Sequence, residues 1–356
     1  MEVINQVLSD ITPQDASWRR RARERLDQLA MPPWALGRLM DLAVDLAGIT
    51  CSLQPAVRHK VIVVMAADHG VAAEGVSKYP QEVTRQMVAA FLNHGAGINA
   101  LADQAGADVR VVDMGVAWGT DDLARSTRLL SMPIAQGTGN IARGPAMTKE
   151  QAVACIGNGI QIAGELIGNS GYDLLGVGEM GIGNTTPSSA IIAALSGESA
   201  AKTTGPGTGI NNERMRHKIA VIEKALLVNR PDPENGLDVL AKIGGFEIGG
   251  IAGVILGAAS LRKPVLIDGL ISTAGALIAQ RLKPEAADYI IAAHRSVEKG
   301  HTIALQCLGK RPLLDLDLRL GEGTGAALAM NLVEAAARVL TQVKTFAEAR
   351  VSEATE

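Results

Sequence analysis

Short runs of apolar residues recur along the chain, and longer segments with apolar positions at helical spacing separate them. Continuous, mostly β-branched runs are typical of strands buried on both faces of a parallel sheet. Because the intervening segments are long enough for crossover helices, the alternation predicts an α/β fold with a doubly wound sheet. The predicted strands are Val61–Ala66, Val109–Val112, Leu174–Val177, Val265–Ile267 and Tyr289–Ala292.

Helices are expected between the strands and at both chain ends. A helix with a charged face is predicted over Asp15–Ala30, and a second helix is predicted to end at Ala47, with Gly48 as its stop signal. The apolar run Ile248–Leu261 is too short to span a bilayer and is typical of a buried helix. Further helices are predicted over Glu82–Asn93, Lys149–Ile167, Pro187–Leu195, Asn211–Asn229, Thr273–Gln280 and Gly325–Ala349.

Composition and charge exclude several classes of function. The chain has 34 basic and 37 acidic residues, so it lacks the basic footprint of a nucleic-acid-binding protein. With three Trp, three Tyr and three Phe, it also lacks the aromatic platforms that single-stranded nucleic acid requires. An average chain of this length has about 25 glycines, whereas this one has 39. We expect the surplus at loops where the backbone approaches a ligand closely.

The amino-terminal segment and the cysteines bear on location and on metal binding. Residues 1–18 include acidic side chains and no basic start or long apolar core, which argues against a secretory signal and favours the cytoplasm. Cys51, Cys155 and Cys307 lie too far apart for a disulfide framework or a zinc site. No HxH or HxxxH spacing occurs, so no metal site is expected. His301, with charged neighbours, is expected at the surface.

Polar residues follow each predicted strand. In open α/β sheets the ligand crevice lies outside the carboxyl ends of the strands, so these are the residues expected to carry function. They are Asp68-His69-Gly70, Asp113-Met114-Gly115, Gly178-Glu179, Asp268-Gly269 and His294-Arg295-Ser296.

One glycine motif matches a dinucleotide-binding fingerprint. The segment Gly176–Gly181 follows a predicted strand and precedes a helix, as the fingerprint requires. No second strand ends in an acidic residue about twenty positions later, where Glu198 lies between small polar residues. An NAD-dependent oxidoreductase therefore remains the alternative. Beyond the motif, Thr186 is predicted to cap a helix with Pro187 in its first position, exposing amide donors to an anion.

Two further glycine clusters suggest a phosphate site. Gly205–Gly209 precedes a helix that carries Lys218, and Gly137–Asn140 follows a polar loop. Neither cluster ends in the Gly-Lys-Ser/Thr tripeptide of a P-loop, which argues against hydrolysis of nucleoside triphosphates. Backbone amides with one lysine suit a phosphate monoester. A solvated helix lysine is the alternative explanation of Lys218, and it is the commoner use of that residue type.

A carboxylate between glycines is a candidate general base. Glu322 lies in Arg319–Gly325, directly before the last predicted helix, where small neighbours leave room for a substrate. A carboxylate stabilised by the helix dipole is the alternative explanation. Glu179 follows another strand and is expected at the same cleft. A non-catalytic nucleotide sensor that uses this cleft stays open as a function of another class.

Four long motifs occur along the chain: Pro32–Leu39, Ala67–Val71, Gly176–Pro187 and Arg319–Ala327. Together they resemble the nicotinate-nucleotide:dimethylbenzimidazole phosphoribosyltransferase family of cobalamin assembly. The resemblance implies a Rossmann-like, doubly wound, mainly parallel sheet, with residues 56–325 as the catalytic domain and residues 1–55 and 326–356 as a small helical domain formed from both chain termini. It also implies a homodimer.

The resemblance implies a reaction and a set of site residues. The 5-phosphoribosyl group of nicotinate mononucleotide moves to a benzimidazole nitrogen, giving α-ribazole 5'-phosphate and nicotinate, with no metal or other cofactor, nucleic acid or membrane involved. Glu322 matches the family's base and Glu179 its second active-site carboxylate. The positions expected to bind the substrates are Gly181, Asn184, Gly207, Lys218, Gly269 and Ser296, with Tyr79 and Met87 at the base.

At the two positions expected to contact the acceptor base, this sequence differs from some members of the family. Some members have serine where this chain has Tyr79 and glutamine where it has Met87. The two residues predict a differently shaped, softer pocket, although Met87 is equally explained as a core residue. The preferred acceptor therefore stays open among dimethylbenzimidazole, other benzimidazoles, a purine and a phenol.

Overall fold

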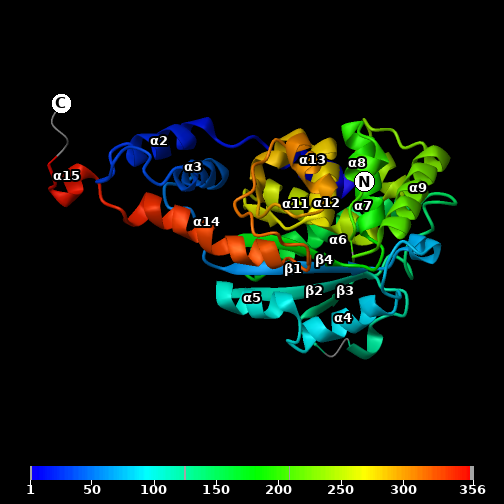
Figure 1. Ribbon diagram of the computed structural model, residues 1–356. Helices are drawn as coiled ribbons and strands as arrows, with labels where there is room; N and C mark the ends of the chain where they lie inside the picture. Colours follow the sequence, from blue (N-terminus) through cyan, green and yellow to red (C-terminus); the bar gives the residue numbers. More distant parts are fainter. Residues whose placement is uncertain (1, 124–125, 208, 353–356) are drawn as a thin grey trace.

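The computed structural model describes residues 2–123, 126–207 and 209–352, and its centre is a six-stranded sheet (Figure 1). All five strand pairs are parallel, and the order β3-β2-β1-β4-β5-β6 reverses direction between β1 and β4. The predicted α/β doubly wound sheet is confirmed. The strands are β1 (Lys60–Ala67), β2 (Ala107–Gly115), β3 (Leu129–Ser131), β4 (Leu174–Met180), β5 (Val265–Ile267) and β6 (Ile290–Ala292).

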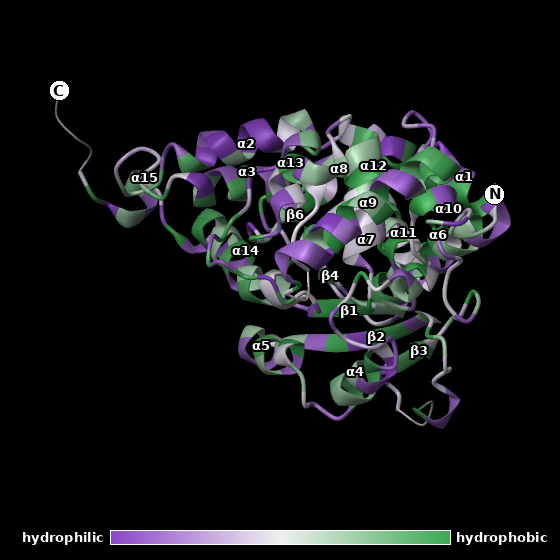
Figure 2. Ribbon diagram, turned by 45° about the vertical axis from the view of Figure 1, so that its right-hand side comes forward, coloured by the Kyte–Doolittle hydropathy of each residue, from purple (hydrophilic) through white to green (hydrophobic). Residues whose placement is uncertain are grey.

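Strand β1 shows why the apolar runs are continuous. Its alternate residues enter two separate cores, with Val61, Val63 and Met65 in one and Ile62 and Val64 in the other. A strand covered by helices on both faces needs apolar side chains at every position, because successive side chains point to opposite faces. The colouring in Figure 2 shows hydrophobic residues along β1 and β2.

Helices cover both faces of the sheet. The buried helix predicted from the apolar run is α11 (Phe246–Ser260), which packs against α6 (Lys149–Gly164) and the central strands. The other face is covered by α4 (Val83–Leu92), α5 (Gly97–Ala105) and α14 (Thr324–Gln342). Between β4 and β5 lie α7 (Thr185–Ser196), α8 (Ala200–Thr203), α9 (Asn212–Asn229) and α10 (Gly236–Ile243). Helix α12 (Leu270–Leu282) lies between β5 and β6, and α13 (Lys299–Cys307) follows β6.

Helices from the two chain ends pack together. The charged helix α2 (Ala16–Leu26), coloured hydrophilic in Figure 2, and α14 both pack against α3 (Arg38–Thr50). Arg25 donates hydrogen bonds to the backbone carbonyls of Leu340 and Val343, which ties α2 to the end of α14. The first and last helices are α1 (Glu2–Asp10), which packs against α6 and α11, and α15 (Phe346–Ala349).

The predicted stop of the second helix at Gly48 is wrong. Helix α3 continues through Gly48 to Thr50. A Cβ atom at Gly48 would lie 2.6 Å from Cγ of Arg19 on α2, so the glycine permits close packing of the two helices instead of ending one. No helix among residues 2–123, 126–207 and 209–352 is long and apolar enough to cross a membrane.

Candidate active site

A cavity of ≈ 480 Å³ lies at the carboxyl ends of the strands, where a doubly wound sheet binds its ligands. Most of its wall comes from loops that follow β4, β5 and β6, together with α4 and the segment before α14. The structure brings together nine of the ten residues predicted for the site. Those that line the cavity are Tyr79, Met87, Glu179, Gly181, Asn184, Gly207, Gly269, Ser296 and Glu322.

Glu322 is held in a tight loop beside the cavity. Gly321, Glu322 and Gly323 have φ angles of +87°, +64° and +92°, all in the left-handed region. For a non-glycine residue this region costs about 1 kcal/mol, so surrounding contacts must fix the loop. The backbone N–H of Ile98, in the first turn of α5, donates to Oε2 of Glu322 at 3.0 Å. Burial raises the pKa of Glu322, aided by the charge of Asp268 and opposed by the Ile98 hydrogen bond.

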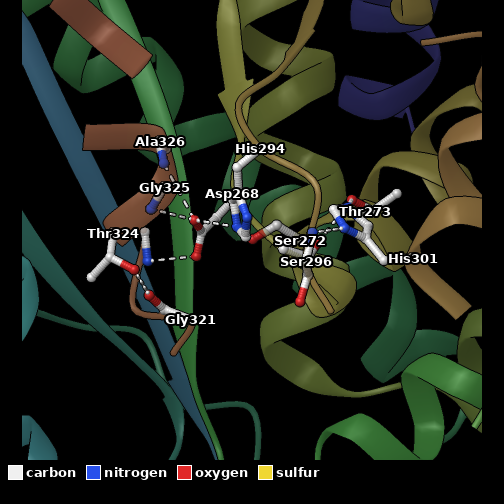
Figure 3. A network of polar contacts seen from close by, with 12 residues as sticks. Asp268, Ser272, Thr273, His294, Ser296, His301, Gly321, Thr324, Gly325 and Ala326 are labelled. Carbon is white, nitrogen blue, oxygen red and sulfur yellow. Dashed lines mark hydrogen bonds and ion pairs between the residues drawn. The ribbon is translucent and has the colours of Figure 1, made fainter. Parts of the chain in front are cut away.

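Asp268, directly after β5, anchors the loop that carries Glu322 (Figure 3). Its carboxylate accepts hydrogen bonds from the backbone N–H groups of Gly323 at 3.1 Å and Gly325 at 2.7 Å. The Nε2 atom of His294, after β6, lies 3.3 Å from the same carboxylate. One buried side chain therefore connects the ends of β5 and β6 to the amino terminus of α14.

Two of the three glycines of the dinucleotide fingerprint have a different role from the one the motif suggests, whereas the third, Gly181, lines the cavity. Gly176 and Gly178 lie inside β4, not in a turn around a ligand. A Cβ atom on Gly178 would overlap the backbone of Glu322, and one on Gly176 would overlap the side chain of Ile62. Gly178 is thus the residue that lets the Glu322 loop approach the sheet.

Glu179 is a second buried carboxyl group in the cavity wall. It accepts a hydrogen bond from Nδ2 of Asn184, and its Oε1 lies against Gly321. Burial raises its pKa to about 8, with the negative charges of Asp268 and Glu247 adding to the effect and the Asn184 hydrogen bond opposing it. At neutral pH this carboxyl group is mostly protonated and can donate a hydrogen bond.

The predicted cap at Thr186 is wrong by two residues. Helix α7 begins at Thr185, and Asn184 is in the N-cap position. The side chain of Asn184 bonds to Glu179 and not to the helix amides, so the local sequence does not reveal its partner. Thr186 is fully buried in the first turn of α7.

Lys218 lies behind the cavity wall. It is 1% exposed, and its Nζ donates a hydrogen bond of 2.7 Å to Oγ1 of Thr185, which lines the cavity. Burial lowers the pKa of Lys218 to about 8, against the opposing charge of Glu298. The alternative explanation, a solvated lysine, is wrong. Thr208, in the neighbouring glycine cluster, lies outside the described residues.

Glu298 lines the cavity and was missed by the sequence reasoning. Its Oε1 accepts a hydrogen bond of 2.9 Å from the backbone N–H of Gly207, one of the amides expected for a phosphate. Burial raises the pKa of Glu298, while Lys218 and the Gly207 amide oppose the increase. Its place two residues beyond Ser296, after a strand, was the only available signal.

The wall near α4 is mostly apolar. Tyr79 is 52% exposed at the mouth of the cavity, and Met87 lines the cavity while also packing against the core that contains Ile62. Both interpretations of Met87 therefore hold in part. Met180 and Leu320 complete this surface, which suits a flat apolar ring.

His301, which was expected at the surface, is fully buried, so that prediction is wrong. Within the described part of the chain, no group of three or more His, Cys, Asp or Glu side chains is placed to hold a metal ion.

Comparison with known proteins gives the family. The profile of a family described as "Phosphoribosyltransferase" matches residues 11–351. Proteins named nicotinate-nucleotide–dimethylbenzimidazole phosphoribosyltransferase from Syntrophotalea carbinolica and Desulfotalea psychrophila are 62% and 54% identical, each over 99% of both chains. A crystal structure with that name from Thermus thermophilus is 45% identical, covers 96% of this chain and 100% of its own, and has a TM-score of 0.90. The chain therefore belongs to the nicotinate-nucleotide–dimethylbenzimidazole phosphoribosyltransferase family.

Proposed function

We propose that the protein transfers the 5-phosphoribosyl group of nicotinate mononucleotide to 5,6-dimethylbenzimidazole or a related base, in the synthesis of the lower ligand of cobalamin. The names of relatives that match the whole chain support this reaction. The observation that carries it is the convergence of Glu322 and Glu179 on one cavity with an apolar wall. Neither an NAD-dependent oxidoreductase nor a nucleotide sensor finds support among these relatives.

The proposed reaction requires one general base and no general acid. A ring nitrogen of the acceptor attacks C1' of the ribose, and the C1'–N bond to the pyridinium breaks with its electron pair moving onto the departing ring. Nicotinate leaves as a neutral ring nitrogen, so no acid has to protonate it. The acceptor would be left cationic unless its other ring N–H loses a proton, and that proton needs a base.

Glu322 is the proposed base. It has a raised pKa, and its Oε2 is anchored by the Ile98 amide, so the carboxylate is positioned before the substrate arrives. A raised pKa lies closer to neutral pH and makes the carboxylate a stronger base than that of a solvent-exposed glutamate. The left-handed loop and Asp268 keep it in place.

Glu179 is the proposed hydrogen-bond donor. With a pKa of about 8, Glu179 is mostly protonated at neutral pH. A buried carboxyl group that keeps its proton can donate a hydrogen bond. We propose that Glu179 donates to the bound nucleotide while Glu322 accepts the proton of the base.

The nucleotide is proposed to lie toward Gly181, Asn184, Gly207, Gly269 and Ser296. A phosphate monoester carries negative charge and suits hydrogen-bond donors. The N–H groups of Gly207 and Ser296 already donate to Glu298 and His301, so the donor proposed here is the hydroxyl of Ser296. Lys218 supports this side indirectly, because it reaches the cavity through Thr185 and Gly207. The acceptor ring is proposed to lie on the apolar wall of Tyr79, Val83, Met87, Met180 and Leu320.

The reaction is tested with purified protein, nicotinate mononucleotide and a panel of bases. We expect nicotinate release, followed by chromatography, to depend on an added base, and dimethylbenzimidazole to serve as an acceptor. The panel should include other benzimidazoles, a purine and a phenol, because Tyr79 and Met87 shape the acceptor site. Absence of release with every base would contradict the proposed function.

We further propose a cytoplasmic homodimer in which the helices of both chain ends form a small helical domain. The family resemblance supports the dimer and the composition of the first residues supports the compartment. The packing of α2 and α14 on α3 supports the domain. Light scattering of the purified protein tests the dimer, and a monomeric mass would contradict it.

A further inference from the structure

Two buried side chains lie behind the nucleotide side of the cavity. Thr273 in α12 and His301 in α13 are both 0% exposed, and neither lines the cavity. Figure 3 shows both side chains next to Ser296, in the loop that follows β6. Ser296 does line the cavity, and so does Gly269, in the loop that follows β5.

Hydrogen bonds link the two loops through these side chains. The backbone N–H of Ser296 donates to Nδ1 of His301 at 2.9 Å. Nε2 of His301 lies 2.9 Å from Oγ1 of Thr273, and that hydroxyl donates to the carbonyl of Gly269 at 2.8 Å. A series of three hydrogen bonds, called the hydrogen-bond chain below, therefore runs from Ser296 through His301 and Thr273 to Gly269.

The direction of every bond in this chain is fixed. A backbone N–H can only donate, so Nδ1 of His301 must be an unprotonated acceptor. The neutral ring then carries its proton on Nε2 and donates it to Thr273. Since the carbonyl of Gly269 can only accept, the hydroxyl of Thr273 passes its own proton forward. If Nδ1 were protonated, its N–H would face the N–H of Ser296, and two donors cannot form a hydrogen bond with each other.

The surroundings of the ring favour the same neutral form. Burial lowers the pKa of His301 to about 3, and the neighbouring His294 adds to the decrease. The two ring centroids lie 5.9 Å apart. His294 itself lies near Asp268, whereas His301 forms no ion pair with another described residue.

The hydrogen-bond chain also leaves the hydroxyl of Ser296 available as a donor to a ligand. The N–H of Glu298 donates to Oγ of Ser296 at 3.3 Å, which orients that hydroxyl. Among the described residues, the hydroxyl of Ser296 donates no hydrogen bond. Ser296 lines the cavity, so its O–H is free to donate to an anionic or hydroxyl group there.

We propose that His301 and Thr273 are positioning residues that fix Ser296 and Gly269 relative to each other for nucleotide binding. The inference rests on the proposed function, because the nucleotide is the ligand assigned to these two positions. Neither side chain touches the cavity, so they act through the backbone that they hold. The acceptor base, on the opposite apolar wall, does not depend on them.

The kinetic test compares Thr273→Val with Thr273→Ser. Valine keeps the shape of threonine and removes the hydroxyl, whereas serine keeps the hydroxyl. Loss of one hydrogen bond and an unpaired partner should raise the KM for nicotinate mononucleotide about five- to tenfold in Thr273→Val. Thr273→Ser should stay close to wild type, and the KM for the base should stay within about twofold in both variants.

The structural test is nitrogen NMR of the His301 ring in wild-type protein and in Thr273→Ser. We expect Nδ1 unprotonated and Nε2 protonated, with no titration between about pH 5 and pH 8. This measurement needs no turnover, so it still decides the hydrogen-bond chain if Thr273→Val does not fold. A wild-type protein without transferase activity would overturn the proposed function but would leave this measurement valid.

Three results would overturn the inference. One is a His301 ring that titrates in that pH range or carries its proton on Nδ1. Another is a Thr273→Ser variant as impaired as Thr273→Val, which would mean that the hydroxyl is irrelevant. The third is an equal increase in the KM values for base and nucleotide, which would indicate a general loss of structure.

Discussion

Glu179→Gln tests whether the buried carboxyl group is protonated in the folded protein. Glutamine has nearly the same shape as a protonated glutamate, and its carbonyl can still accept the hydrogen bond from Asn184. The substitution therefore removes a titrating group while keeping a neutral polar side chain. The quantity to measure is the free energy of unfolding as a function of pH.

The magnitude follows from the pKa of Glu179. Its ordinary value is 4.5 and its value in the folded protein is about 8. At 1.36 kcal/mol for each pH unit, the full difference is worth about 5 kcal/mol. Between these two values the folded protein binds a proton that the unfolded chain has lost, so stability falls as pH rises, by about 1.4 kcal/mol per unit.

The assay is urea unfolding of wild type and Glu179→Gln at several pH values. Because glutamine does not titrate, the stability of the variant minus that of wild type should increase by about 2.7 kcal/mol from pH 5.5 to pH 7.5. The increase should level off above about pH 8. Glu223→Gln, the same chemical change on an exposed residue of α9, is the control. A difference that does not change with pH would refute a protonated Glu179.

Three further substitutions test the other parts of the site. Glu322→Gln should lower kcat about 100- to 10,000-fold while nucleotide binding, followed by calorimetry, is retained; an active variant would move the base elsewhere. Gly178→Ala should destabilise the protein by about 1–3 kcal/mol and lower kcat, measured by unfolding and turnover, because its Cβ overlaps the Glu322 loop. Lys218→Met should raise the KM for nicotinate mononucleotide about tenfold or more, and an unchanged KM would exclude its supporting role.

The strands were predictable because their burial imposes a simple pattern. Every residue of β1 is buried, so its apolar run is continuous and needs no tertiary information to recognise. Strand β3 (Leu129–Ser131) was missed although β5 and β6, which also have three residues each, were predicted. All three residues of β5 and of β6 are buried, whereas only Leu129 is buried in β3, so its sequence lacks a continuous apolar run.

The glycines show where sequence reasoning fails. The surplus was expected at ligand loops, and Gly207 and Gly269 do line the cavity. Gly253 instead lies on α11, where a Cβ atom would overlap the carbonyl of Ile156 on α6. Gly178 makes room for a loop more than a hundred residues away in sequence. Local motifs cannot separate these uses, because the neighbour that each glycine admits comes from elsewhere in the chain.

The polar residues show the same limit. The positions of Glu179, Asp268 and Ser296 were predictable, because they lie at or just beyond the carboxyl ends of strands that meet at one edge of the sheet. Their hydrogen-bond partners were not. His301 seemed exposed beside Lys299, but α13 buries it against Thr273. Burial of a polar side chain depends on partners that only the fold brings together.

The configuration of the product tests the central claim most directly. Wild-type protein is incubated with nicotinate mononucleotide and dimethylbenzimidazole, and the riboside is isolated and examined by proton NMR. Attack of the base opposite the departing nicotinate inverts C1', so the account predicts the α-linked riboside 5'-phosphate. A β-linked product, or ribose 5-phosphate from hydrolysis alone, would contradict it.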